Sequence, residues 1–105
     1  MMTREFNTNI ANVCGVNAAV VAHYIYLSLM EGTRASEEYG DDEWCRCSVK
    51  MFTAEIPCLT YSMVETALEK LLETGIVRKR CLNKNRFDHT NWYTFTDYGY
   101  QFYEW

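Results

Sequence analysis

One stretch, residues 59–77, constrains the fold more than any other part of the chain. Its apolar residues recur with the period of an α-helix and form one continuous stripe: Val64, Ala67, Leu68, Leu71 and Leu72. Thr60 is a suitable N-cap because its hydroxyl can accept from the free amides of the first turn, and Gly75 can end the helix with a positive φ. The pattern predicts a helix over residues 61–74 with a buried inner face and an acidic outer face.

The segments before this helix predict further helices. Residues 8–14 suit a short helix, and Asn17 is the expected N-cap of a longer helix over residues 18–30. The longer helix is apolar almost all round, which allows two arrangements: it is the central helix of the domain, or a second copy of the chain covers part of it. Ser48 is the expected cap of a third helix, which Pro57 ends.

The rest of the chain predicts a loop, strands and a terminal helix. Residues 31–43 contain six carboxylates and one arginine and are predicted to form a long solvated loop. This segment lacks the spaced oxygen ligands of a calcium loop. One short strand is expected over residues 44–47. Alternating apolar residues over 76–82 and 92–96 predict a β-hairpin with a long polar tip, followed by a helix over about 97–105.

This order predicts one domain over residues 1–105, because 105 residues are enough for one core and too few for two. The predicted fold class is mainly α with a small β-hairpin, that is α+β, in the winged helix-turn-helix arrangement. The helix-turn-helix would lie at about 48–74, the wing hairpin at about 76–96 and the C-terminal helix at about 97–105. An aromatic content of 15% supplies enough apolar surface for such a core without a disulfide or a metal.

Basic residues concentrate in the predicted wing. Half of the Lys and Arg residues lie between positions 78 and 86, with no acidic residue among them: Arg78, Lys79, Arg80, Lys84 and Arg86. Such a cluster can bind phosphates although the net charge is −4, because salt screens the distant carboxylates. We therefore expect these residues to contact double-stranded DNA, with Asn85 as an additional hydrogen-bonding residue.

The outer face of the 61–74 helix is a second candidate for DNA contact. Tyr61, Ser62 and Thr66 could reach phosphates or base edges near the positive N-terminal end of the helix. Glu65 and Glu69 oppose this contact because their carboxylates repel phosphates. The sequence therefore predicts that the wing makes the main contact.

Three pieces of the sequence, at residues 10–25, 52–77 and 83–95, carry a family resemblance. The first is a helix followed by a long apolar helix, and the second is the predicted helix-turn-helix. In the third, a basic tip, an Asp and a Thr precede a Trp-Tyr pair. Together they resemble the N-terminal winged-helix domain of replication-initiation proteins of phages, plasmids and integrative elements. The resemblance implies a DNA-binding winged helix that acts in replication initiation or transcriptional regulation, with a replication or regulatory protein as partner.

The alternative prediction is a protein-interaction module that does not bind DNA. The apolar 18–30 helix, the acidic outer helix and an aromatic stripe on the terminal helix all favour a homodimer or another protein partner. The residues expected at this interface are Tyr24, Tyr98, Phe102 and Trp105.

No catalytic motif is recognisable, so the sequence predicts no enzymatic activity, no cofactor and no metal site. Cys45 and Cys47 are separated by one residue rather than two to four, and buried free thiols are a better interpretation than a zinc site. The five irregularly spaced cysteines, the lack of a signal-like N-terminus and the lack of a bilayer-length apolar run predict a soluble, reduced, cytoplasmic protein.

Overall fold

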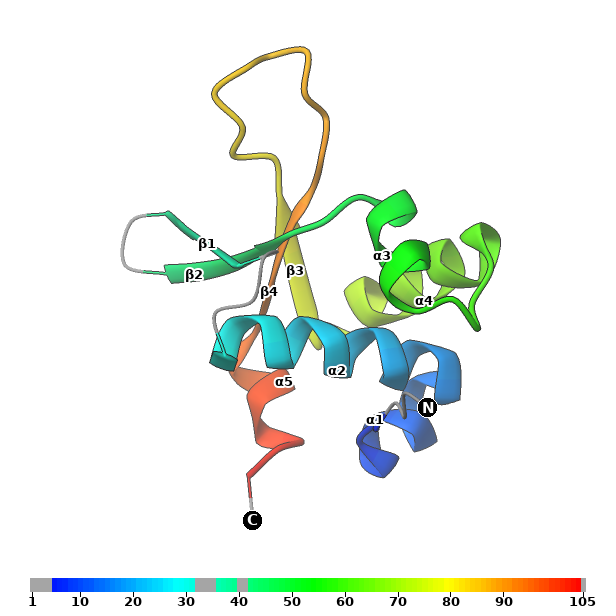
Figure 1. Ribbon diagram of the computed structural model, residues 1–105. Helices are drawn as coiled ribbons and strands as arrows, with labels where there is room; N and C mark the ends of the chain where they lie inside the picture. Colours follow the sequence, from blue (N-terminus) through cyan, green and yellow to red (C-terminus); the bar gives the residue numbers. More distant parts are fainter. Residues whose placement is uncertain (1–4, 32–35, 40–41, 105) are drawn as a thin grey trace.

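The computed structural model describes residues 5–31, 36–39 and 42–104, with only the backbone for residues 36–39 and for Asp42. Within these ranges the chain has an α+β architecture of five helices and a four-stranded antiparallel sheet (Figure 1). The helices are α1 (Thr8–Cys14), α2 (Val16–Glu31), α3 (Val49–Glu55), α4 (Tyr61–Glu73) and α5 (Asp97–Gln101). The strands, in spatial order, are β1 (Ser36–Tyr39), β2 (Asp42–Arg46), β4 (Trp92–Phe95) and β3 (Val77–Arg80).

Helix α2 is the central helix, which is the first of the two arrangements that its apolar composition allowed. It packs against α1, α4, β2 and β4. Its fully or almost fully buried apolar residues are Ala18, Ala19, Val21, Ala22, Ile25 and Leu29. Each buried Val, Ile or Leu stabilises the fold by about 2 kcal/mol relative to exposure. The helix begins at Val16, so Asn17 lies inside its first turn and is not the N-cap that the sequence predicts.

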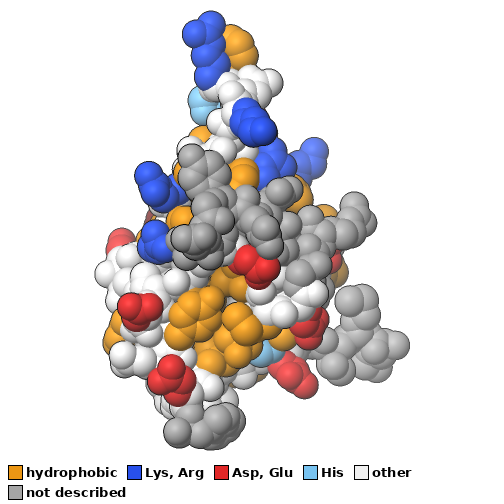
Figure 2. All heavy atoms as spheres, turned by 90° about the vertical axis from the view of Figure 1, so that its left-hand side faces the viewer, with side chains coloured by type: hydrophobic (Ala, Val, Ile, Leu, Met, Phe, Trp, Pro, Cys, Tyr) orange, Lys and Arg blue, Asp and Glu red, His pale blue; other side chains and the backbone are white. Residues whose placement is uncertain are grey.

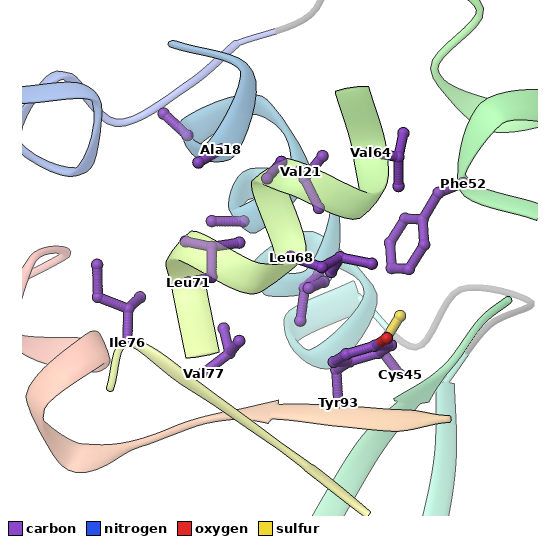
Figure 3. Packing of buried hydrophobic residues seen from close by; sticks show 14 of the residues in the cluster. Ala18, Val21, Cys45, Phe52, Val64, Leu68, Leu71, Ile76, Val77 and Tyr93 are labelled. Carbon is purple, nitrogen blue, oxygen red and sulfur yellow. The ribbon is translucent and has the colours of Figure 1, made fainter. Parts of the chain in front are cut away.

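Helix α4 has the cap and the inner face that the sequence predicts. Thr60 Oγ1 accepts from the Met63 N–H over 3.2 Å, and Gly75 follows the helix with a φ of +78°. Figure 3 shows its apolar side chains directed into the core between α2, α3 and the sheet. The outer face is exposed and consists mainly of Tyr61, Ser62, Glu65, Thr66, Glu69 and Glu73.

The prediction of a loop over residues 31–43 is wrong for β1 and the first part of β2. The two strands pair in antiparallel register, with Ser36 opposite Cys45, and β2 continues the sheet with Cys45 opposite Tyr93. The addition of β1 satisfies backbone groups of β2 that would otherwise lie at a sheet edge. Because this pairing uses backbone atoms, the pattern of acidic and polar side chains in the segment does not indicate a strand.

The C-terminal helix is shorter than the predicted 97–105. Thr96 is its N-cap, with Oγ1 accepting from the Gly99 N–H over 2.9 Å, and α5 ends at Gln101. Gly99 is buried against the start of β3: a Cβ atom there would lie 2.0 Å from the carbonyl oxygen of Ile76. The close approach of the two backbones therefore requires glycine at this position.

Aromatic side chains of β4 and of the segment that follows it cover one side of α2. The rings of Tyr26 and Tyr103 stack with 3.8 Å between their centroids, and Phe95 and Tyr100 pack around them. His23 Nδ1 lies 2.9 Å from the Tyr103 hydroxyl. Residues of the same chain thus cover part of the α2 surface, which the sequence allowed a second copy of the chain to cover.

Asn7 links the two ends of the described chain. As the N-cap of α1, its Oδ1 accepts from the amides of Asn9 and Ile10 over 2.9 and 3.1 Å. The Nδ2 of the same side chain donates to the Phe102 carbonyl oxygen over 2.7 Å. One amide group therefore holds both the start of the first helix and the turn that follows the last one.

Candidate nucleic-acid interface

Positive charge gathers on the β3–β4 hairpin, which projects beyond the helices in Figure 1. Arg78, Lys79 and Arg80 on β3 are exposed, as are Lys84 and Arg86 in the segment that connects the strands. We call this connecting segment, residues 81–91, the hairpin tip. On the face seen in Figure 2, the Lys and Arg side chains lie toward the tip and the Asp and Glu side chains lie on the body. The hairpin is therefore the basic pole of the molecule.

The strand pairing determines where the charges of β3 lie. Arg80 pairs with Trp92, and Lys79 pairs with the core residue Tyr93. Because side chains alternate along a strand, Arg78 and Arg80 lie on the outer face of the sheet, opposite to the helices. The Arg78 guanidinium lies 4.8 Å from the centroid of the buried Trp44 ring, a cation–π contact on this face.

Arg46, at the end of β2, belongs to the same outer face, because it also pairs with Trp92. Its Nε donates to Asn83 Oδ1 over 3.0 Å, and its guanidinium forms an ion pair with Asp88. Arg46 was not among the predicted site residues. The alternation of Trp44 and Arg46 indicates a strand, but nothing local in the sequence says which strand it pairs with.

Asn83 gives the hairpin tip its shape. Its Oδ1 accepts from Trp92 Nε1 over 2.8 Å as well as from Arg46, and its Nδ2 donates to the carbonyl oxygens of Asp88 and Thr90 over 3.0 and 2.7 Å. One side chain therefore joins β2, β4 and the tip. The tip has no strand structure, yet hydrogen bonds fix its course and so position Lys84 and Arg86.

Asp88, the one acidic residue of the tip, is neutralised locally. Hydrogen bonds from Thr90, whose N–H donates to Asp88 Oδ1 over 3.0 Å, lower the pKa of this carboxyl group, and Arg46 lowers it further. The carboxylate therefore stays ionised and paired. The negative charge of Asp88 offsets the positive charge of Arg46. The net positive charge of the tip therefore comes from Lys84 and Arg86.

Asn85 and Phe87 lie at the exposed end of the tip. Asn85 is predicted to contact DNA, but its Oδ1 accepts from the Phe87 N–H over 2.9 Å, so this oxygen is used within the loop. Phe87 is 75% exposed, and the Arg86 guanidinium lies 5.0 Å from the centroid of its ring. Phe87 was not among the predicted site residues, although it directly follows the basic Arg86 in the sequence.

The predicted DNA contacts on α4 lie on a separate element. Ser62 and Thr66 line a hollow of about 230 Å³ together with Lys70 of the same helix and with residues at the start of α2. Tyr61 is exposed beside them, and exposed Glu65 and Glu69 interrupt this face. The structure therefore brings the basic residues of the hairpin together, while the candidates on α4 share their surface with acids.

The residues predicted for a protein interface occupy different environments. Tyr24 is half-buried with its ring 5.6 Å from that of Phe52, and burial raises its hydroxyl pKa to about 12. Phe102 is also half-buried, while Tyr98 is exposed and lies edge-on to the Phe102 ring at 5.2 Å. Trp105 lies outside the described residues.

The cysteines divide into buried and exposed thiols. Cys14, Cys45 and Cys47 are buried, whereas Cys58 and Cys81 are exposed. Among the residues that the structure describes, no group of three or more His, Cys, Asp or Glu side chains is placed to hold a metal ion. Within the same ranges, no helix is long and apolar enough to cross a membrane.

Comparison with known proteins gives no family assignment: no protein-family model, no curated protein and no solved structure matches the chain. The resemblance carried by the three pieces of sequence therefore stays a prediction. Function must be inferred from the surface that the hairpin and the helices present.

Proposed function

We propose that the chain is a winged-helix DNA-binding protein of the mobile-element type, acting in replication initiation or transcriptional regulation. In this proposal it contacts duplex DNA mainly through the β3–β4 hairpin. One observation carries it: five exposed cations lie on a projecting hairpin whose single acid is paired with Arg46. The succession of α3, α4 and the hairpin supports the winged-helix arrangement. The replication or regulatory role rests on the sequence resemblance alone.

The hairpin offers phosphates two groups of contacts. Arg78 and Arg80 lie on one face of β3, where they can follow a DNA backbone, while Lys84 and Arg86 extend to the tip. Since hydrogen bonds through Asn83 already fix the tip, little further conformational entropy is lost when DNA binds. If all five cations neutralise phosphates, log Kobs should fall against log salt with a slope of about −4.5.

Helix α4 contributes less in this proposal. Ser62 and Thr66 can donate to phosphates, but Glu65 and Glu69 on the same exposed face repel them. We therefore expect moderate affinity that depends strongly on salt.

The test is fluorescence anisotropy of a labelled duplex at several salt concentrations. The Lys84→Gln/Arg86→Gln variant removes two charges from the tip, and we expect a salt slope smaller by about 2 and weaker binding at low salt. A matched control, Lys50→Gln/Lys70→Gln, removes two exposed charges from α3 and α4 and should change binding much less. Absence of binding to any duplex at low salt, or equal losses in both double variants, would overturn the proposal.

A protein-interaction module is the second candidate function, and the acidic face of α4 favours it. Glu65, Glu69 and Glu73 are exposed there, and Tyr98 is an exposed aromatic residue on α5. A homodimer or a replication or regulatory protein would be the partner. Sedimentation equilibrium of the wild type and of Tyr98→Ala tests the homodimer. A wild type that is monomeric at all concentrations would argue against the homodimer. A Tyr98→Ala variant that dimerises as strongly as the wild type would argue against an interface that contains Tyr98.

A further inference from the structure

Phe87 is the most exposed large apolar side chain among the residues that the structure describes. We propose that Phe87 is a wedge that inserts between base pairs of duplex DNA in the minor groove and kinks the duplex. The inference rests on the proposed function, because it names what the tip of the same hairpin does to the bound DNA.

The position of Phe87 distinguishes it from scattered surface hydrophobic residues, which are common in proteins. Its N–H donates to Asn85 Oδ1 over 2.9 Å, and the next N–H, of Asp88, donates to the Asn85 carbonyl oxygen over 3.0 Å. The hydrogen bonds of Asn83 in turn fix Asp88. The backbone on both sides of the ring is thus held in place, and the ring is held in water at the projecting end of the hairpin.

Folding alone gives no reason for this exposure. Transferring a Phe ring from water to an apolar surrounding is favourable, and stacked bases supply such a surrounding. The Arg86 guanidinium lies 5.0 Å from the ring centroid, and Lys84 is exposed in the same tip, so that both cations can bind phosphates near an opened base step. Minor-groove proteins frequently kink DNA by inserting an apolar side chain such as Phe between base steps, and they use Arg and Lys in the same groove.

Duplex DNA fits the tip better than single-stranded DNA. Single-strand sites stack successive bases on several aromatic side chains along a groove. In the tip, residues 81–91, Phe87 is the one Phe, Tyr or Trp, and it stands at a projecting end rather than in a groove. One ring can occupy one base step, as a wedge does.

The test measures DNA bending separately from binding. A short duplex with a central TA step, which is easily unstacked, carries a fluorescence donor and an acceptor at its two ends. We expect saturating wild-type protein at low salt to shorten the end-to-end distance, with a kink of about 20–90°. Phe87→Ala should abolish most of this shortening while binding within about tenfold of wild type, with an unchanged salt slope, since phosphate contacts set that slope.

Two further variants control the measurement. Phe87→Leu keeps an apolar wedge and should retain most of the bending, whereas Val13→Ala reduces an exposed apolar side chain on α1 and should bend DNA as wild type does. Bending by Phe87→Ala equal to that of wild type would overturn the wedge, as would an unbent duplex with bound wild type. The wedge would also be overturned if Phe87→Ala weakened the binding of single-stranded DNA and left duplex bending unchanged. Wild type that binds no duplex would show instead that the proposed function fails.

Discussion

The indole of Trp92 and the side-chain amide of Asn83 face each other at the base of the hairpin tip, with Nε1 donating to Oδ1 over 2.8 Å. Trp92 is almost fully buried on β4, so it is a fixed point for the loop that precedes it. Because the same Asn83 oxygen also accepts from Arg46, the loop is attached to β2 as well. The position of the cationic tip therefore depends on a neutral side chain.

Replacing Asn83 with alanine should lower the free energy of unfolding by about 2 kcal/mol, because it leaves the partly buried donors of Trp92 and Arg46 without this acceptor. Urea unfolding measures this loss, and hydrogen exchange should show faster exchange in the tip. Asn85→Ala is the matched control: it removes an exposed acceptor and should cost about 0.5 kcal/mol or less. Equal losses in the two variants would contradict the role assigned to Asn83.

The order of the tip should depend on pH through Asp88. Hydrogen bonds from Thr90 and the charge of Arg46 lower the pKa of Asp88 below its ordinary value of 3.8. A lowered carboxyl pKa means that the ionised form stabilises the folded tip, so this stability is complete above pH 3.8 and is lost as the pH falls through the folded-state pKa. A proton NMR titration of the Thr90 amide should follow this loss. The Asp88→Asn variant should remove the transition, and a midpoint above 3.8 in wild type would refute the assignment.

Gly99→Ala should destabilise the fold by about 3 kcal/mol, because an added methyl group overpacks a site that cannot give way. The new Cβ would lie 2.0 Å from the Ile76 carbonyl oxygen and 3.1 Å from the Phe95 ring. Either α5 moves away from the sheet or β3 shifts. Thermal unfolding measures the effect, and Gln101→Ala on the exposed side of the same helix should be nearly neutral. A Gly99→Ala protein as stable as the wild type would show that α5 does not pack as described.

His23 should make stability depend on pH near neutrality. Burial lowers the pKa of His23 below 6.5, against the smaller raising effects of Glu5 and Glu31. The unfolded chain therefore binds the proton more readily, so the contribution of the neutral imidazole is complete above pH 6.5 and declines as the pH falls toward the folded-state pKa. Urea midpoints above and below pH 6.5 should differ in wild type and differ less in His23→Gln. A stability that rises as the pH falls through this range would contradict the sign.

The parts of the fold that were predictable from sequence are those that local rules determine. Thr60 and Ser48 cap their helices as predicted, and the stripe from Val64 to Leu71 is buried. Tyr93 and Phe95 share the core face of β4, as alternation requires. These features depend on the helical and strand periods, which a sequence displays directly.

The remaining differences arise where distant segments decide the structure. β1 contains two Glu residues and no apolar stripe, and only the edge of β2 gives its backbone a partner. The terminal aromatic residues that pack on α2 are Tyr100 and Tyr103. The i, i+4 spacing of Tyr98 and Phe102 did not predict this pair. The spacing assumes a continuous helix, whereas α5 ends before Tyr103. Likewise, the role of Arg46 follows from its pairing opposite Trp92, which no local pattern specifies.

The double use of Asn7 has a consequence for how the fold comes apart. Helix ends ordinarily fray independently of one another, each on its own local equilibrium. Here the amide that caps α1 also binds the Phe102 carbonyl, 95 residues further along the chain. Release of the C-terminal turn therefore removes one of the hydrogen bonds that hold the capping side chain of α1, and loss of the cap removes an anchor of the turn. Fraying at one end of the described chain is thus coupled to fraying at the other.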